Sequence, residues 1–287
     1  MKSCDIIKYK KILIETLKAF NDFCEMHNLK YFACGGTAIG AVRHKGIIPW
    51  DDDIDVCMLR DDYNRFIELK DKCLGTDYRI IDLNDKGYYL PFAKFVNNNT
   101  TIWEYKEKPF IFGVFIDVFP LNTTNSSYEY NYIIYKKYNR LISLYNAAIS
   151  EYQICDLIKK KELGRFKMYI KHLILKPLRT IIFKQVLKIE DKIKYNNNGD
   201  YLLNYYTPYK IEKELFPQDW FKSQITFPFE NVTIKLPNGY HEYLTQLFGN
   251  YMTLPPIEKR IRPHSRYYYN LDKRLTIDEI LSIKNDK

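Results

Sequence analysis

The chain has 287 residues, of which 46% are hydrophobic, so it is long enough for one large domain or two small ones with a sizeable core. It contains no uninterrupted apolar stretch of membrane-spanning length, and the segment from Met1 to Phe23 mixes charges with its apolar residues. We therefore expect neither a spanning helix nor a signal peptide, and we expect a cytoplasmic protein. The formal net charge of +9 fits an anionic membrane or a phosphorylated substrate, while the lack of a nucleic-acid-binding signature argues against nucleic acid.

The first part of the chain alternates helical and extended patterns. In chain order we expect a helix over 5–27, a strand over 30–33, a helix that Thr37 caps and that ends near Arg43, a strand over 53–58 and a helix over 60–72. Strand-like runs follow at 78–83, 88–96, 101–105 and 113–119. This order predicts an α/β (α+β) domain built on a mixed sheet.

The second part begins with a polar break at 122–127 and then reads as mainly helical to about Lys194. Residues 196–199 predict a turn. A last module over 216–270 has a strand-like stretch at 220–236 and a helical one at 240–251. The six cysteines are scattered without a C-x-x-C pair, which predicts reduced and mostly buried thiols.

The segment from Gly35 to Val56 is the most informative part of the chain. Downstream of a glycine turn, four carboxylates lie within one run of five residues, those of Asp51, Asp52, Asp53 and Asp55. Like charges this close repel one another unless a cation neutralises them. Strand alternation places Asp53 and Asp55 on one face, where they can share Mg²⁺ (or Mn²⁺).

The alternatives are a solvated acidic turn and a calcium loop. An EF-hand would require Gly at the sixth position and normally Glu at the twelfth, where this chain has Val56 and Asp62.

A third carboxylate, Asp117, interrupts the apolar strand over 113–119. Burial of an unpaired carboxylate costs several kcal/mol, so a metal shared with Asp53 and Asp55 would explain it; the alternative is an edge strand with Asp117 in solvent. Lys94 also lies in an apolar strand and should have a charge partner, either a phosphate or one of the aspartates.

Several residues near the acidic cluster are candidate substrate-binding residues. Gly35 and Gly36 allow close approach of a phosphate, and a helix beginning at Thr37 would direct free N–H groups toward it. The basic residues Arg43 and His44 can neutralise phosphate or form a solvated turn.

Trp50 can stack on a ring of the substrate or pack beside Pro49. The next residues along the chain, Asp51 and Asp52, can bind a second metal or shape the loop.

These motifs together resemble the nucleotidyltransferase fold and, more closely, the LicD family of phosphocholine transferases, with the fukutin-related proteins as more distant relatives. The resemblance covers both ends of the chain but not the helical middle. Its segments are 31–66, 92–95, 113–121, 229–231, 243–252 and 254–256. Many relatives have paired histidines where this chain has His264-Ser265, which leaves the role of His264 open.

The resemblance implies a reaction in which a CDP-activated alcohol such as CDP-choline gives its phospho-alcohol to a hydroxyl of a cell-surface glycan, and CMP leaves. Asp53 and Asp55 would hold the metal across the two phosphates. Asp117 would be a further ligand or the base for the acceptor hydroxyl. Two other hypotheses stay open, an NTP-dependent nucleotidyltransferase and an inactive glycan- or membrane-binding relative.

The domain organisation follows from these assignments. Residues 1–125 are the predicted nucleotidyltransferase-like catalytic core, 126–200 an appended basic helical region, and 201–287 a C-terminal module that completes the catalytic domain. Within the middle region, Leu163–Ile189 has seven Lys or Arg and no acid. This basic segment either contacts an anionic membrane at the cytoplasmic face, where a lipid-linked glycan acceptor would be found, or packs on the core.

Overall fold

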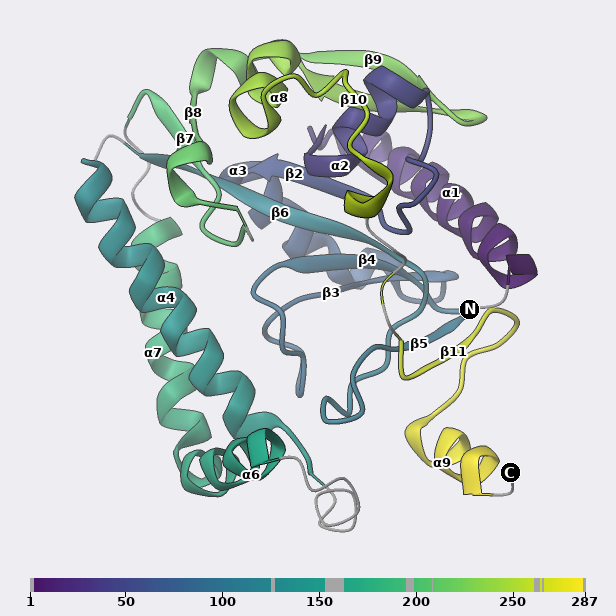
Figure 1. Cartoon of the computed structure of the whole chain (residues 1–287), viewed down its shortest axis with the longest axis vertical. Helices are drawn as coiled ribbons and strands as arrows, with labels where there is room; N and C mark the ends of the chain where they lie inside the picture. Colours follow the sequence, from purple (N-terminus) through teal and green to yellow (C-terminus); the bar gives the residue numbers. More distant parts are fainter. Residues whose placement is uncertain are drawn as a thin grey trace.

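A seven-stranded mixed sheet forms the centre of the structure (Figure 1). The computed structural model describes residues 3–124, 127–152, 163–194, 199–207, 209–260, 264 and 266–285. The sheet has the order β1-β2-β6-β4-β3, with β7 and β8 added beyond the end of β6. Its strands are β1 (Phe32–Ala33), β2 (Asp55–Leu59), β3 (Tyr78–Ile81), β4 (Ala93–Asn97), β6 (Phe115–Thr124), β7 (Tyr201–Leu203) and β8 (Leu215–Pro217). Because β2 and β6 are parallel and the other pairs antiparallel, the predicted mixed α/β sheet is confirmed.

Helices α1 (Ser3–Met26) and α3 (Arg60–Glu68) cover one face of this sheet. The predicted apolar stripe of α1 is buried, and the Phe20 ring lies 5.6 Å from the ring of Phe95 on β4. Since side chains alternate along a strand, Lys94 next to Phe95 points to the opposite face. Its register partner Asp117 on β6 points there too. The face away from α1 therefore carries the polar residues.

The helical middle of the chain forms a second body beside the sheet, as predicted. Helices α4 (Tyr128–Ile149) and α7 (Arg179–Lys194) pack lengthwise, and α6 (Leu163–Leu175) crosses their far end (Figure 1). Tyr138 on α4 and Val186 on α7 are fully buried between them. Buried Arg60 ties this body to the sheet, because it lies 3.1 Å from Glu190 and donates to Asn122 and Tyr206.

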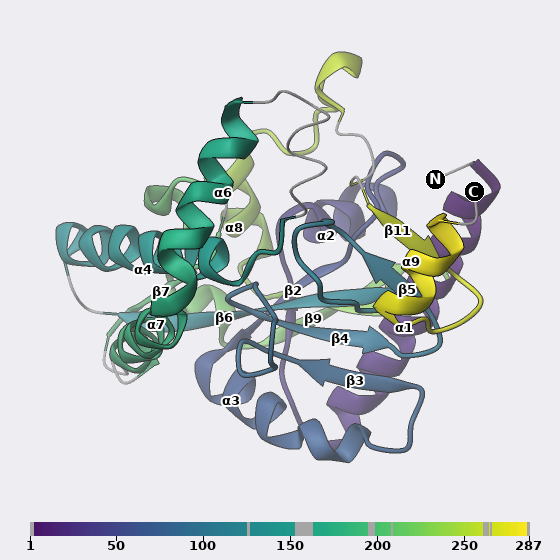
Figure 2. The same cartoon turned by 90° about the horizontal axis from the view of Figure 1, so that it is seen from below.

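The C-terminal part returns to the N-terminal core. Strands β9 (Gln224–Phe229) and β10 (Val232–Pro237) form a hairpin, and α8 (Tyr240–Phe248) packs on α2 (Gly35–Ile39). Strand β11 (Tyr268–Asn270) pairs with β5 (Thr101–Trp103), and α9 (Ile277–Asn285) follows it (Figure 2). The two ends of the chain therefore build the region of the predicted site together.

Three predicted boundaries were wrong. The polar break at 122–127 was placed too early, because β6 runs to Thr124 and its polar end pairs with β7. Strand β2 begins at Asp55 and not at Asp53. The stretch 220–236 contains a helical turn, Gln218–Phe221, before its hairpin.

Two further predictions concern small features. Residues 196–198 of the predicted turn lie outside the described residues. The cysteine prediction holds where it is described, since Cys24, Cys34, Cys57 and Cys73 are free and buried. Among the helices that the structure describes, none has the length and apolarity needed to cross a membrane.

Candidate active site

Two of the three predicted catalytic carboxylates stand side by side on the parallel strands at the centre of the sheet. Asp55 opens β2, and its register partner on β6 is Asp117. Paired residues of adjacent strands are about 5 Å apart and point to the same face. The strand order therefore brings together residues that are 62 positions apart in the sequence.

Lys94 on β4 extends this row to a third strand. It is the register partner of Asp117, and its Nζ atom lies 2.5 Å from Asp117 Oδ1. The ammonium group is buried and lies 3.3 Å from the centroid of the Phe115 ring, which stabilises the charge by a cation–π contact. The predicted charge partner of Lys94 is therefore Asp117, and Asp117 is buried and paired, not solvent-exposed.

The glycine turn lies directly against the carboxylates. Gly35 has a φ of +54°, a conformation that favours glycine. A Cβ atom on Gly35 would lie 3.8 Å from Asp55 Oδ2, and one on Gly36 would lie 2.8 Å from Asp51 Oδ2. The second distance is too short for a real contact. Only glycine lets the backbone approach the acidic side chains this closely.

The helix after the turn differs from the prediction. It begins at Gly35, two residues before Thr37, and continues as a π-helical turn over Gly40–His44. Thr37 does not cap it; its Oγ1 atom accepts the N–H of Asp55 at 2.8 Å. Thr37 therefore fixes the first residue of β2 against the turn, and the N–H of Gly35 donates to the Tyr243 hydroxyl.

The pKa values of the carboxylates in this site are raised by burial and, to a smaller extent, by neighbouring carboxylates. Burial, followed by Asp51, raises the pKa of Asp53 to about 7. Burial raises the pKa of Asp117 to about 6, against the opposing effect of Lys94. The pKa of Asp55 is raised well above its usual range by burial, then by Asp53 and Asp117. These shifts place the three predicted residues in one electrostatic cluster.

This donor set fits a hard divalent cation. Carboxylate oxygens are the ligands that Mg²⁺ and Mn²⁺ prefer, and a cation would relieve the repulsion that the pKa shifts record. In the part of the chain that the structure describes, no three His, Cys, Asp or Glu side chains are already arranged as a metal-binding group. The metal and the roles of Asp53, Asp55 and Asp117 in holding it stay predictions.

Asp52 has a different place from its neighbours. It is buried and accepts from Arg266 Nη1 at 2.6 Å and from His264 Nδ1 at 2.8 Å. Arg266 also donates to the Tyr9 hydroxyl, so α1, the acidic loop and the C-terminal segment meet at this carboxylate. The pKa of Asp52 falls to about 2, and that of His264 rises to about 9 because of its bond to Asp52. His264, whose role the sequence left open, joins this contact and lies 3.8 Å from Asp53.

The remaining predicted binding residues, Arg43, His44 and Trp50, are engaged in contacts with other parts of the protein. Arg43 donates to the carbonyls of Tyr251 and Thr253 and to the ring of His44. His44 lies edge-on to Trp50, and Arg260 lies over the Trp50 ring at 4.7 Å. Arg43, His44 and Trp50 are thus brought together, but Arg43 is bonded to backbone and holds the loop after α8.

Two residues near the cluster were not predicted. A Cβ atom on Gly35 would lie 3.9 Å from the Tyr209 hydroxyl, and the pKa of Tyr209 is raised by burial and then by Asp55. Glu104, just after β5, accepts from the Tyr89 hydroxyl at 2.8 Å and contributes to the raised pKa of Asp117. Neither lies in a motif, so only the fold reveals them.

A mixed sheet with carboxylates on adjacent parallel strands beside a glycine turn defines a nucleotidyltransferase-like site. Residues 28–160 match the family described as LicD/FKTN/FKRP, nucleotidyltransferase domain. The lipopolysaccharide cholinephosphotransferase LicD of Haemophilus influenzae is 31% identical over 270 residues, which are 92% of this chain and 97% of that protein. Uncharacterized proteins of Rickettsia typhi and Rickettsia prowazekii are 37% and 42% identical over segments that cover 24% and 17% of this chain and 22% and 19% of their own lengths.

The chain therefore belongs to the LicD family, as its motifs indicated, and it is a phosphotransferase.

The like-charge repulsion predicts an unusual effect of Asp53→Asn on the metal-free protein. Because the pKa of Asp53 is raised to about 7, the folded state is penalised once this group ionises. The variant should therefore be more stable than the wild type at pH 8, by about 2 kcal/mol, and no more stable at pH 4. Thermal unfolding in EDTA at both pH values measures this; a less stable variant at pH 8 would contradict the described electrostatics.

Asp52→Asn should have the opposite effect. Removing one charge from a buried ion pair leaves buried Arg266 uncompensated, which costs about 3 kcal/mol. Urea unfolding at pH 7 measures the loss, with Asp61→Asn, an exposed acid in the first turn of α3, as the matched control. Equal stability of the two variants would show that the contact with Arg266 and His264 contributes nothing.

Proposed function

We propose that the protein transfers phosphocholine, or a similar phospho-alcohol, from a CDP-activated donor to a hydroxyl of a cell-surface glycan and releases CMP. The juxtaposition of Asp55 and Asp117 beneath the glycine turn carries the proposal. The relative from Haemophilus influenzae, named as a lipopolysaccharide cholinephosphotransferase, supports the choice of phosphocholine and of a glycan acceptor.

In this reaction the acceptor oxygen attacks the phosphorus that bears the alcohol. A new P–O bond forms to the sugar, the P–O bond to CMP breaks, and the hydroxyl proton must leave. Asp117 would take that proton; its pKa of about 6, close to neutral pH, and its bond to Lys94 support this role. The alternative role for Asp117 is a further metal ligand.

Asp53 and Asp55 would hold Mg²⁺ (or Mn²⁺), which supplies charge neutralisation for the phosphates and the leaving CMP. Gly35 and Gly36, which lie against these carboxylates, would bind a phosphate through their backbone. The Trp50 ring, over which Arg260 lies at 4.7 Å, would stack on the cytosine.

A donor screen tests the proposal. Purified enzyme is incubated with CDP-choline, CDP-ribitol or CDP-glycerol and a glycan acceptor, and CMP is measured. CMP should appear with Mg²⁺ or Mn²⁺ and fall at least a hundredfold in EDTA or in Asp55→Asn. Release of pyrophosphate from CTP or ATP, with no CMP from any CDP-alcohol, would instead establish an NTP-dependent nucleotidyltransferase.

We further infer that the basic segment Leu163–Ile189 contacts an anionic membrane at the cytoplasmic face, where a lipid-linked acceptor would be reached. Apolar side chains with helical spacing are exposed along α6 and into the start of α7, because no other part of the described chain covers them. They are Phe166, Ile170, Leu173, Ile174, Leu178 and Ile181. Exposed apolar residues interspersed with lysines are typical of a helix that lies in the headgroup region.

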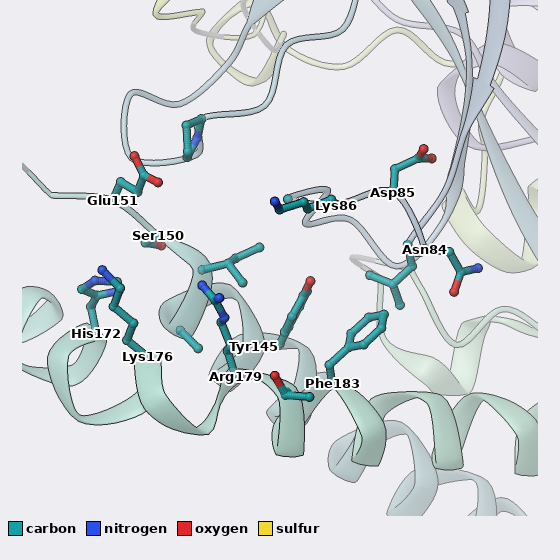
Figure 3. A pocket seen from close by; sticks show the side chains of 16 residues that line it. Asn84, Asp85, Lys86, Tyr145, Ser150, Glu151, His172, Lys176, Arg179 and Phe183 are labelled. Carbon is teal, nitrogen blue, oxygen red and sulfur yellow. The ribbon is translucent and has the colours of Figure 1, made fainter.

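A basic cleft opens beside this surface. It has a volume of about 470 Å³, and Lys86 reaches into it from one side while Lys176 and Arg179 reach in from the helices opposite (Figure 3). Tyr145 and Phe183 form its floor. Of the two acids that line it, Asp85 is paired with Lys70, and Glu151 lies beside the basic residues. The three cations outnumber these acids, so the cleft would favour phosphate groups such as those of lipid headgroups.

Vesicle flotation tests the membrane contact. The wild type should float with vesicles containing phosphatidylglycerol at low salt and be released at high salt, since each basic residue near such a surface contributes about 1 kcal/mol. Changing Lys171, Lys176, Arg179 and Lys184 to Gln should abolish flotation. The matched control changes four exposed lysines elsewhere, Lys11, Lys18, Lys30 and Lys72, to Gln. Equal loss in both variants would show that only net charge matters.

A further inference from the structure

A second cleft, of about 540 Å³, lies between α4 and the segment Tyr89–Lys108. Its walls differ from those of the basic cleft. Tyr89 and Tyr105 form one side, with ring centroids 6.2 Å apart at 74°. The other side is a polar stripe of α4, formed by Asn139, Ser143, Asn146 and Ser150. These four residues recur at helical spacing, so they face the same direction. We call this space the tyrosine cleft.

The side-chain amide of Asn146, which lines the tyrosine cleft, has an unsatisfied hydrogen-bond acceptor. Its Oδ1 atom is buried and has no hydrogen-bond partner among the described residues. A buried acceptor without a donor is unfavourable, and nearly all such groups in folded proteins are satisfied. Since this oxygen has no partner among the described residues, it can accept a hydrogen bond from a ligand in the cleft.

The tyrosine cleft is joined to the catalytic row through aromatic contacts. The Tyr89 ring lies 6.3 Å from the ring of Phe112. That ring is 5.2 Å from Lys94 Nζ, which bonds Asp117. The Tyr89 hydroxyl also donates to Glu104 at 2.8 Å. The Phe112 ring and Lys94 therefore connect the wall of the cleft to Asp117, the residue that would receive the acceptor's proton.

The chemistry of the lining selects a neutral, hydroxyl-rich ligand. The ionisable groups around it are Glu107, Lys108 and Lys171. Lys108 is already engaged, because its Nζ atom donates to the backbone carbonyl of Asn146 and to Ser150 Oγ. Besides these groups, the lining has flat aromatic rings, amides and hydroxyls together with the apolar side chains of Leu90, Ile142 and Met168. These groups pack on the apolar faces of a sugar ring and bond its hydroxyls.

We infer that the tyrosine cleft is the acceptor subsite, which binds the sugar residue whose hydroxyl is modified or the residue next to it. Tyr105 and Asn146 are the specificity residues of this subsite. The inference rests on the proposed transfer to a glycan, and it assigns the donor and the acceptor to opposite sides of the Asp55–Asp117 row.

Steady-state kinetics with Tyr105→Ala and Asn146→Ala test the inference. Tyr105 is 55% exposed, so its removal leaves the core intact. The matched control is Tyr130→Ala, on the first turn of α4, which is 48% exposed and outside the cleft. Each cleft variant should raise the KM for a lipopolysaccharide core oligosaccharide about tenfold, the effect expected for one lost contact. The KM for CDP-choline and the slow release of CMP to water should not change.

An unchanged acceptor KM in both cleft variants would overturn the inference, as would an equal rise in the donor KM. A binding measurement separates this failure from failure of the proposed function. If the wild type releases no CMP from any CDP-alcohol, saturation-transfer NMR with methyl glycosides of hexoses and N-acetylhexosamines still tests the cleft. Signals that Tyr105→Ala abolishes and Tyr130→Ala keeps would support it; no signal from the wild type would overturn it.

Discussion

The site depends on electrostatic repulsion between buried carboxylates, which the neighbouring positive charges do not fully offset. Burial raises the pKa values of Asp53, Asp55 and Asp117, and neighbouring carboxylates raise them further, with Asp51 acting on Asp53 and Asp55. Lys94 offsets part of this effect at Asp117, and His264 offsets part of it at Asp53. Natural sequences accumulate such unfavourable clusters at functional sites. A bound cation, with the phosphates that accompany it, is the physical condition under which this arrangement becomes favourable.

The surrounding elements can be understood as the support for this cluster. The parallel pairing of β2 and β6 sets the spacing of Asp55 and Asp117, and Thr37 fixes the first residue of β2. Asp52 does not take part in the cluster, because Arg266 and His264 bind it and close the C-terminal segment over the loop. The glycine turn approaches from the other side. The contacts of Asp52 with oppositely charged groups thus hold the loop in place, while the neighbouring carboxylates remain available to a cation.

The sequence predicted the class of fold and most of the residues at the centre, for identifiable reasons. Periodicity located α1, and an isolated Asp in an apolar strand marked Asp117. Charge balance alone required a partner for Lys94, which the structure supplies. By contrast, the role of Thr37 was mistaken, because a threonine after a glycine turn satisfies the rules for a helix cap equally well.

Other features depended on pairings that the local sequence does not encode. The polar end of β6 looked like a loop until β7, almost 80 residues later, paired with it. The contacts of Asp52 with His264 and Arg266 join segments more than 200 residues apart. The tyrosine cleft is likewise formed by α4 and the segment Tyr89–Lys108, which are separate in the sequence. Neither periodicity nor motifs predict long-range contacts of this kind. These contacts nevertheless give Asp52, the neighbour of Asp53, its structural role.

Proton release on metal binding tests the central claim most directly. At pH 6.5, between the pKa values of Asp117 and Asp53, the metal-free site should be partly protonated. Calorimetric titration of Mn²⁺ in two buffers with different ionisation enthalpies should show release of at least one proton at this pH, because Asp53 and Asp55 both have raised pKa values, and release of fewer protons at pH 8.5. Tight binding without proton release at pH 6.5, or no binding at either pH, would contradict the account of a strained carboxylate cluster that a cation completes.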